Sequence, residues 1–540
     1  MMKILKATNE NIKTYKPGSV DRANLIEKYD ELSSKIIDIP ITINGEEIRT
    51  GNFGYSIIPH NHKHILAKYH KAGKKEITHA IETSLKSWQS WSKTSLLERT
   101  NVFRKAAKLL SGPWRDIVNA STMLNQSKNV HQAEIDSACE LIDFFNFNCQ
   151  FAEQIYSNQS LISPKGTKNY FEYRSLEGFV FAITPFNFTS ISGNLPTAPA
   201  IMGNVSIWKP ASSAVYSSFF INQLLIEAGL PKGVINFIPG AGDEIGNIIL
   251  KNKNLAGVHF TGSSQTFQNI FSKIGSNINN YKNYPRIVGE TGGKGYCLVH
   301  ESANHKVLIA SMIRGAFEYQ GQKCSALSRA YIPVNLWEKI KTNYINEMHT
   351  IKVGSPRNCE NFVNAVIDKK AFNSIKTYIN HAKNSNDAKI ITGGTYDDSK
   401  GYFITPTTII TLNPYFKTMV EEIFGPVLTI YLYKPKDWKS IISLVDKTSP
   451  YGLTGAVIGQ DKIALEEAKK GLVHSAGNFY INDKPTGAVV GQQPFGGARS
   501  SGTNDKAGSI FNLQRWISIR TVKEHFQPPS NYRYPFLKNN

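Results

Sequence analysis

The chain has 540 residues, more than one ordinary hydrophobic core accommodates, so we expect two or three domains. Apolar residues make up 41% and charged residues 19%, which excludes a disordered chain, and no apolar run is long enough to cross a bilayer. The net charge of +20 is compatible with nucleic-acid binding, but the lysines are dispersed rather than clustered, so we expect no nucleic-acid partner. A basic chain also suits acidic substrates.

The five cysteines are few and widely spaced, and they form no CxxC pair. This excludes a disulfide scaffold and fits a reducing compartment. Alternating histidines in PHNHKH (His60, His62 and His64) have no cysteine or carboxylate close by. We interpret them as a polar loop or strand face and predict no metal site.

The N-terminal sequence MMKILKATNENIKTYKPGS has no apolar core of a secretion signal and lacks the arginines of a mitochondrial presequence. Residues 1–50 are predicted to be an irregular N-terminal arm. Helical periodicity follows at residues 76–110 and again at 131–151.

Between residues 177 and 300, short apolar runs alternate with amphipathic segments. The predicted strands are 177–184, 204–210, 233–240, 255–262 and 286–293, with helices between them. Strand, helix and strand in repetition are typical of βαβ units on a parallel sheet. We therefore predict an α/β fold whose nucleotide-binding domain, residues 51–154 and 177–300, is a doubly wound sheet.

The alternation of helices and strands begins again after residue 300 and predicts a second α/β domain over residues 301–499. Its expected strands contain SRAYIPV, TPTTIITL, PVLTIYLY, LTGAVIG and NFYIND. Residues 155–176 are predicted to form a protruding β-hairpin.

Several polar residues follow the predicted strands of the first domain. Lys209 in WKP stands where a ligand crevice would open, although a surface lysine would look the same. In FTGSSQTF, Gly262 allows close backbone approach and Ser263 could bond a phosphate at a helix start. A simple helix N-cap is the alternative for Ser263.

Two further residues have side chains suited to acyl chemistry. Glu290 ends a strand before Gly292 and Gly293, so it is a candidate water-activating base or, alternatively, a loop residue capping a turn. Asn187, between two phenylalanines, is a candidate oxyanion donor or a turn asparagine.

Cys324 lies in EYQGQKCSALSRA, among small and polar residues rather than the apolar neighbours of a structural cysteine. A nucleophile and an inert small-pocket cysteine are both consistent with this setting. Together with Asn187 and Glu290, however, Cys324 completes a set of nucleophile, oxyanion donor and base.

Seven motifs in order, TPFNF, WKPAS, FTGSS, ETGGKG, GQKCSA, EEIFGPV and PFGGARSSG, resemble those of aldehyde dehydrogenases over about residues 50–525. Longer stretches, AEIDSACELIDFFNFN and TGAVVGQQPFGGARSSGTNDKAG among them, resemble the members that oxidise L-glutamate γ-semialdehyde to L-glutamate, the second step of proline degradation. The resemblance implies NAD as cofactor, a homodimer or higher oligomer with residues 155–176 and 500–540 as oligomerisation segments, and a mitochondrial matrix location, with the cytoplasm as alternative.

The resemblance also implies residue roles. Cys324 attacks the aldehyde, Asn187 and the Cys324 N–H hold the oxyanion, and Glu290 activates water. Cofactor contacts are implied for Thr184, Lys209, Gly262, Ser263, Glu422 and Phe424. The substrate's amino-acid end would be bound by Ser325, Phe495 and the backbone N–H groups of Gly487 and Ala488 in residues 486–493, hereafter the anchor loop.

Two departures from the family pattern matter. ELGGK is replaced by ETGGK, and the segment after WKP is ASSA, with Ser212 and no acid to repel a 2′-phosphate, which leaves NADP use open. Other functions compatible with the sequence are oxidation of another semialdehyde such as succinate semialdehyde, acyl transfer to coenzyme A, and a catalytically silent basic binding protein.

Overall fold

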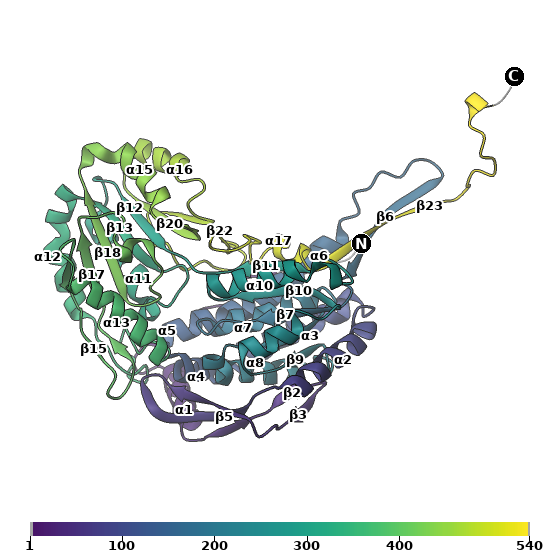
Figure 1. Cartoon of the computed structure of the whole chain (residues 1–540), viewed down its shortest axis with the longest axis horizontal. Coiled ribbons are helices and arrows are strands. Elements are labelled where there is room, and N and C mark those ends of the chain that lie inside the picture. Colours follow the sequence, from purple (N-terminus) through teal and green to yellow (C-terminus); the bar gives the residue numbers. More distant parts are fainter. Residues whose placement is uncertain (1–3, 538–540) are drawn as a thin grey trace.

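Two adjoining α/β lobes and a projecting two-stranded arm make up the chain (Figure 1). The structure is a computed structural model and describes residues 4–537. Within these residues, no helix combines the length and apolar character needed to cross a membrane.

The first lobe is built on a sheet in the order β11-β10-β7-β8-β9-β2-β3. Its parallel strands are almost wholly buried because helices cover both faces. This confirms the predicted doubly wound sheet. The strands are β7 (Phe179–Ile183), β8 (Val205–Lys209), β9 (Ile235–Phe237), β10 (Leu255–Thr261) and β11 (Arg286–Glu290). The helices include α2 (Lys74–Trp91), α3 (Leu96–Ser111), α4 (Arg115–Gln126), α7 (Thr189–Ile201), α8 (Val215–Glu227), α9 (Gly242–Ile249) and α10 (Ser264–Ser276).

The order of the strands in the first sheet determines where a ligand crevice opens. The chain runs from β7 outward through β8 to β9, then crosses back to β10 on the other side of β7. At such a reversal the two connecting segments leave the sheet in opposite directions, so a crevice opens at the carboxyl ends of β7 and β10. Thr184, Lys209, Gly262 and Glu290 lie at or directly after the carboxyl ends of these parallel strands.

The second lobe contains a sheet in the order β14-β17-β18-β13-β12-β20-β21, parallel except for β14. Its strands are β12 (Gly295–Val299), β13 (Leu327–Pro333), β14 (Ala388–Thr392), β17 (Thr407–Thr411), β18 (Val427–Tyr433), β20 (Thr454–Ile458) and β21 (Asn478–Ile481). The main helices are α11 (His305–Phe317), α12 (Val334–Thr350), α13 (Lys369–Lys383), α15 (Trp438–Lys447) and α16 (Lys462–Gly471). The second α/β unit is thus present, but β12 belongs to it, so the predicted boundary after residue 300 lies too late.

The N-terminal segment is more regular than predicted. It contains helix α1 (Val20–Ser33) and strands β1 (Ile37–Ile39), β2 (Ile41–Ile43) and β3 (Glu46–Ile48). β2 and β3 extend the first sheet, and β1 pairs with β5 (Asn61–His70), which also pairs with β4 (Phe53–Ile58). The prediction of an irregular arm is therefore wrong for residues 20–48. Residues 1–3 of that predicted arm lie outside the described part of the chain.

The helical prediction for residues 131–151 is confirmed, with an irregularity. A short helix α5 (Val130–Ala133) leads into a π-helical turn, Glu134–Cys139, and then into α6 (Glu140–Ser157). The extra residue of a π-turn rotates the side chains that follow it. Glu134 and Asp136 of this turn are buried.

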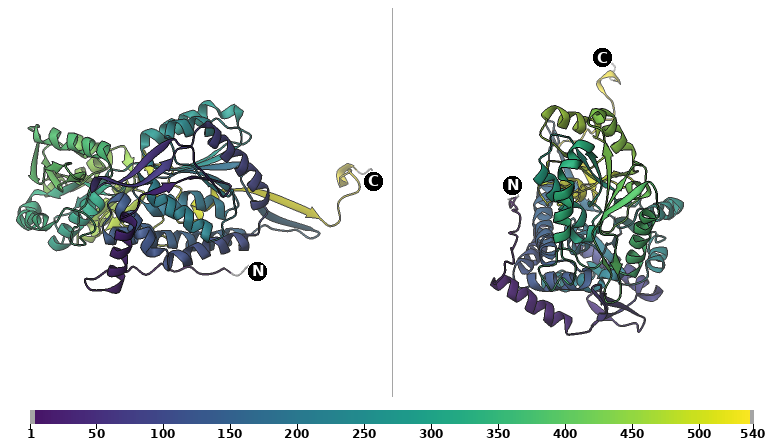
Figure 2. Two further views of the ribbon diagram at one scale, coloured as in Figure 1. Left: turned by 90° about the horizontal axis from the view of Figure 1, so that it is seen from below. Right: turned by 90° about the vertical axis from the view of Figure 1, so that its left-hand side faces the viewer.

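The projecting arm is not the hairpin predicted within residues 155–176. Strand β6 (Thr167–Ser175) pairs antiparallel with β23 (Ile517–His525), from the other end of the chain (Figures 1 and 2). The predicted segments 155–176 and 500–540 therefore build the arm together. Residues 538–540 fall outside what the structure describes.

Asn204, which precedes β8, joins the arm to the first sheet. Its side chain is fully buried, accepts the N–H of Leu176 at 2.8 Å, and donates to the carbonyls of Pro199 and Trp516 at 2.9 and 2.8 Å. Leu176 follows β6 and Trp516 precedes β23, so one side chain fixes both strands.

We expect Asn204→Ala to lower the free energy of unfolding by about 3 kcal/mol, because it leaves the N–H of Leu176 and the carbonyl of Trp516 without a partner, whereas the carbonyl of Pro199 keeps the N–H groups of Met202 and Asn204. Urea denaturation followed by fluorescence measures the loss. Asn169→Ala removes a peripheral bond in the arm to the carbonyl of Ile162 and should change stability by less than about 0.5 kcal/mol. Equal effects of the two substitutions would contradict this role of Asn204.

Candidate active site

Cys324 follows a tight turn, Glu318–Gly321, in which Tyr319 and Gln320 adopt left-handed backbone angles. The neighbouring glutamines hold this turn. Gln320 Nε2 donates to the carbonyls of Ser127 and Ala365, and Gln322 Oε1 accepts the N–H of Ile367. Cys324 itself is half-buried. The glutamines that made the segment look exposed in the sequence are buried and fix the position of the cysteine.

Glycine is required where the ETGGK segment passes the cysteine. A Cβ on Gly293 would overlap the carbonyl oxygen of Cys324, and a Cβ on Gly295 would overlap that of Ala326. The segment between Glu290 and β12 therefore lies directly on the backbone of the Cys324 loop.

Asn187 is brought to the cysteine by a hydrogen bond. Its side chain is buried, and Nδ2 donates to the carbonyl of Gln322 at 3.1 Å. An amide nitrogen carries two hydrogens, so one remains for a ligand beside Cys324. The hydrogen bond brings Asn187 to the loop that carries Cys324, and it leaves Asn187 one N–H to donate to a ligand.

Glu290 lies in a desolvated position at the end of β11. Its Oε2 is buried and has no hydrogen-bond partner among residues 4–537, and a Cβ on Gly496 would lie 2.9 Å from its Oε1. Burial raises the pKa of Glu290 well above its ordinary value, Lys506 lowers it, and Asp505 raises it further. A raised pKa makes this carboxylate a stronger base than an exposed glutamate.

The surroundings of Cys324 raise the pKa of its thiol. Burial raises its pKa first, and the negative charges of Glu290 and Glu422 raise it further, while the N–H groups of Cys324 and Ser325 act in the opposite direction. The two N–H groups aimed at sulfur are also the donors available to an oxygen bound at the same place.

The predicted cofactor residues line the crevice in different ways. Burial lowers the pKa of Lys209 to about 8, partly countered by Asp243. Ser263 caps α10 by accepting the N–H of Thr266, so the N-cap alternative for its hydroxyl is correct. Thr184 directs its hydroxyl inward, to Ser192 and to the indole N–H of Trp208. Its side chain thus serves the fold, and its main-chain N–H donates to the carbonyl of Lys209 at 3.1 Å.

Glu422 and Phe424 connect this crevice to Cys324. Glu422 Oε1 accepts the N–H of Gly293 at 2.7 Å, and burial raises its pKa to about 7. The ring of Phe424 contacts that of Phe186 edge-on at 5.7 Å, next to Asn187. A dinucleotide binds to a cationic side chain, a strand end with glycine, a helix N-terminus and a carboxylate acceptor. The crevice offers these groups, so its residues fit such a cofactor.

The anchor loop meets the cysteine loop through one contact, in which the hydroxyls of Ser325 and Thr486 lie 2.7 Å apart. Gly487 has φ of 97°, a conformation that favours glycine. The N–H groups of Gly487 and Ala488 find no acceptor among residues 4–537. Phe495 is half-buried and pairs its backbone with Ala507. The contact between Ser325 and Thr486 therefore places the start of the anchor loop beside the residue that follows Cys324, and Phe495 lies shortly after this loop in the chain.

The three alternating histidines are structural. His60 bonds Tyr29 and Ser127, while His62 and His64 contact the carbonyls of Asp398 and Ser33. They lie on or beside β5, as the strand-face interpretation requires. In the part of the chain that the structure describes, no three His, Cys, Asp or Glu side chains are grouped to hold a metal ion.

Comparison with known proteins identifies the family to which the chain belongs. Residues 50–522 match the aldehyde dehydrogenase family. The chain belongs to this family. The curated relative from Dictyostelium discoideum, named "Delta-1-pyrroline-5-carboxylate dehydrogenase, mitochondrial", is 49% identical over 98% of this chain and 95% of its own length. "Delta-1-pyrroline-5-carboxylate dehydrogenase" from Agaricus bisporus is 46% identical over 99% of this chain and 98% of its own length.

Solved structures agree with the family assignment. The crystal structure of the Delta-pyrroline-5-carboxylate dehydrogenase from Mycobacterium tuberculosis bound with NAD has a TM-score of 0.96 and 44% identity, and the match covers 100% of this chain and 99% of that one. The aldehyde dehydrogenase fold predicted from the motifs is therefore confirmed.

A buried charge cluster beside this aldehyde dehydrogenase site was not predicted. Lys128 Nζ lies 2.6 Å from Asp136 and 4.2 Å from the ring centre of Phe188, the neighbour of Asn187. Lys323, the neighbour of Cys324, lies 3.4 Å from the same carboxylate. Lys323 adjoins the catalytic motif and was therefore visible in the sequence, but Asp136 reaches it only because the π-turn points it inward.

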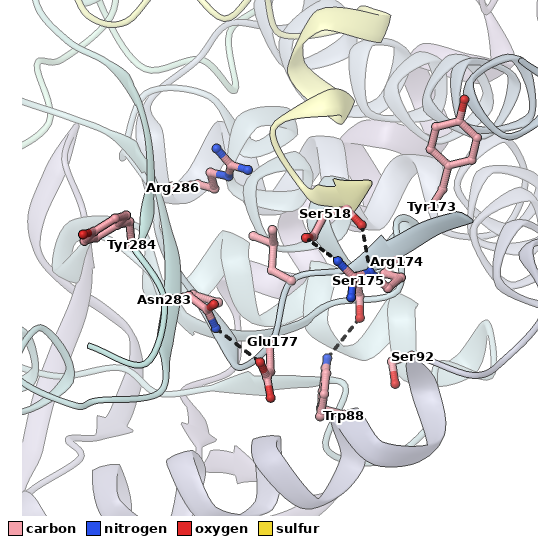
Figure 3. A pocket seen from close by; sticks show the side chains of 12 residues that line it. Trp88, Ser92, Tyr173, Arg174, Ser175, Glu177, Asn283, Tyr284, Arg286 and Ser518 are labelled. Carbon is pink, nitrogen blue, oxygen red and sulfur yellow. Dashed lines mark hydrogen bonds between the residues drawn. The ribbon is translucent and has the colours of Figure 1, made fainter. Parts of the chain in front are cut away.

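A cavity of roughly 710 Å³ lies away from the chemistry, at the base of the arm. Figure 3 shows Trp88, Tyr173 and Tyr284 around it, with Arg174 bonded to Ser518. None of the predicted catalytic or cofactor residues lines it.

We expect iodoacetamide to alkylate Cys324 in the cofactor-free enzyme at a rate that still rises above pH 9, because its raised pKa delays formation of the thiolate. An ordinary thiol, with a pKa of about 8.5, would by then be levelling off. Mass spectrometry of the peptide containing Cys324 follows the reaction. A plateau below pH 8 would mean that the thiol is activated rather than suppressed in this state.

We expect Gly496→Ala to reduce kcat at least about tenfold, because the added methyl group displaces the carboxylate of Glu290. Gly275→Ala is the matched control, since a Cβ at Gly275 in α10 meets nothing within 4 Å. Steady-state kinetics and thermal melting separate catalysis from folding. Unchanged kcat in a correctly folded Gly496→Ala enzyme would show that the carboxylate has room to move aside.

Proposed function

We propose that this chain oxidises L-glutamate γ-semialdehyde, the open form of 1-pyrroline-5-carboxylate, to L-glutamate with NAD as oxidant. The observation that carries the proposal is the 2.7 Å contact between Ser325 and Thr486. It joins the residue after the nucleophile to a loop with unpartnered backbone N–H groups. An aldehyde that also carries a carboxylate would use both ends of this region.

The chain's own residues account for covalent catalysis. The sulfur of Cys324 adds to the aldehyde carbon, and the new oxyanion accepts hydrogen bonds from Asn187 Nδ2 and the Cys324 N–H. Held by residues such as Lys209 and Glu422, bound NAD would supply the two-electron oxidising power that this adduct needs to become a thioester, as acceptor of the hydride that leaves the aldehyde carbon. Glu290 then takes a proton from water as the water adds to the acyl carbon. The carbon–sulfur bond breaks, which releases the carboxylate product and restores the thiolate of Cys324.

The α-carboxylate of the substrate can be recognised by hydrogen-bond donors of the protein without a positively charged side chain. The N–H groups of Gly487 and Ala488 can donate to the α-carboxylate without introducing a mobile cation. Phe495 and the hydroxyl of Ser325 would complete the pocket. Comparable anchoring is not available to a simple aliphatic aldehyde, so the anchor loop is proposed as the origin of substrate preference.

A homodimer or higher homo-oligomer is proposed to form through the arm. β6 and β23 pair with each other and, among the described residues, with no other strand, so both outer edges carry unpaired backbone groups. Apolar side chains such as Ile519 and Phe526 are exposed on the arm and just beyond it. A second copy of the chain would cover these groups.

A location in the mitochondrial matrix is also proposed. It is supported by the name of the Dictyostelium relative, whereas the name of the Agaricus relative does not specify a compartment. A cytoplasmic location is the alternative, and fluorescence microscopy of the tagged full-length chain separates the two.

NADH production should favour L-glutamate γ-semialdehyde over succinic semialdehyde by at least about tenfold in kcat/KM, because the carboxylate of the latter lies one carbon nearer its aldehyde and does not reach the N–H groups of Gly487 and Ala488 when the aldehyde is at Cys324. Absorbance at 340 nm, with NAD and NADP run in parallel, measures this. Cys324→Ala should abolish turnover and preserve cofactor binding, whereas Cys359→Ala should be active because Cys359 lies in a surface turn. Turnover by Cys324→Ala would refute the covalent mechanism, and equal use of the two semialdehydes would refute the assigned substrate.

A further inference from the structure

The N-terminal segment is fastened along one face of α6 and the π-turn before it (Figure 2). Its backbone N–H groups donate in turn to four side chains. Leu5 donates to Glu153 at 3.1 Å, Ala7 to Gln150 at 2.6 Å, Glu10 to Asp143 at 2.7 Å, and Lys13 to Glu134 at 2.8 Å. The segment is therefore held at regular intervals over residues 5–13.

Asn9 extends from this segment to the anchor loop. Its Nδ2 donates to Asp143 Oδ2 at 2.8 Å and to the carbonyl of Val490 at 2.7 Å. Its Oδ1 accepts a hydrogen bond from Gln492 Nε2 at 3.0 Å. The two anchor-loop contacts cross 481 and 483 residues of sequence. Asp143 and Val490 are both buried, so two of the three bonds end on groups that are shielded from water.

The same part of the anchor loop lies close against α6. A Cβ on Gly491 would overlap the ring of Phe147, and Gly491 has φ of 82°. Val490 is buried near Gly508. At the other end of the loop, Thr486 is fixed by its bond to Ser325. The unpartnered N–H groups of Gly487 and Ala488 lie between these two attachments.

We propose that Asn9 is a positioning residue for recognition of the substrate's carboxylate. By holding Val490 and Gln492 against α6, it fixes the loop so that the N–H groups of Gly487 and Ala488 converge on one anion. Asn9 does not touch the reacting atoms. The inference rests on the proposed function of the anchor loop and assigns to the N-terminal segment a part in substrate selection.

The proposal separates two classes of substrate. Loss of Asn9 should weaken binding of an aldehyde that carries an α-carboxylate and leave a simple aldehyde unaffected. A backbone donor that is misplaced by a fraction of an ångström loses much of its hydrogen bond. The chemical step at Cys324 is not altered, so the change should appear in KM rather than in kcat.

The test compares full-length wild-type enzyme with Asn9→Ala. KM and kcat are measured for L-glutamate γ-semialdehyde and for propionaldehyde, and binding of L-glutamate is measured by calorimetry. For Asn9→Ala we expect KM for the semialdehyde and Kd for L-glutamate to rise about tenfold, with kcat changed less than twofold. The kinetic constants for propionaldehyde should stay within twofold of wild type.

Gln150→Ala is the matched control. It removes another attachment of the same segment, the acceptor for the Ala7 N–H, and within residues 4–537 the Gln150 side chain makes no hydrogen bond to the anchor loop. It should leave both substrates unaffected. Gln492→Ala is a second test that does not depend on the stability of Asn9→Ala, because Gln492 is exposed. It should raise KM for the semialdehyde about threefold, and combining it with Asn9→Ala should add little.

The failures are distinguishable. If wild-type enzyme prefers the semialdehyde but the Asn9 and Gln492 variants change both substrates equally, or neither, the role of Asn9 is overturned and the proposed function stands. If Gln150→Ala matches Asn9→Ala, the effect is a general loosening of the segment and the proposal fails. If wild-type enzyme does not prefer the semialdehyde, the proposed function and the inference fall together.

Discussion

The site depends on a short connection between the two sheets. Glu290 ends β11 in the first sheet and Gly295 begins β12 in the second, so only residues 291–294 join them. This connection lies on the backbone of Cys324, and its Gly293 N–H binds Glu422. Any longer or bulkier link would separate the base from the nucleophile. The geometry of catalysis is therefore a consequence of how closely glycine allows two backbones to approach.

The close approach of the two sheets also shifts the pKa values of ionisable groups by burying them. Burial raises the pKa of Glu422 to about 7 and lowers that of Lys294, in the connection itself, also to about 7. The Nζ of Lys294 is buried and has no hydrogen-bond partner within residues 4–537. The pKa values of an acidic and a basic group are thus both shifted toward the neutral form in the connection and at its partner Glu422. A site prepared in this way can respond to a charged ligand with little reorganisation of its own side chains.

Much of this could be predicted from sequence because the information is local. The strands of both sheets are short apolar runs, and Cys324, Asn187 and Glu290 each lie in a distinctive motif. The failures share a physical cause. β12 follows a glycine-rich loop without a turn to mark its start, α1 buries only Leu25 and Tyr29 and so has a weak pattern, and β6 pairs with a strand from the other end of the chain. Asp136 is likewise positioned by a π-turn that periodicity does not reveal.

Selective binding of one substrate requires backbone groups that point in a fixed direction, a requirement that differs from those of the chemical step. The amide of Asn187 can be recognised in the sequence because the residue type itself defines the functional group. A backbone N–H is present at almost every residue, so it can recognise a ligand specifically only when its direction is fixed. The anchor loop contains two glycines with positive φ, Gly487 and Gly491. Glycine tolerates these backbone angles, but it also leaves the loop more conformational freedom than other residues would. That freedom must be removed by contacts from elsewhere, here from Ser325 and Asn9. If the anchor loop binds the substrate as proposed, the determinants of substrate choice include Asn9, which does not touch the substrate and lies hundreds of positions from Cys324 in the chain.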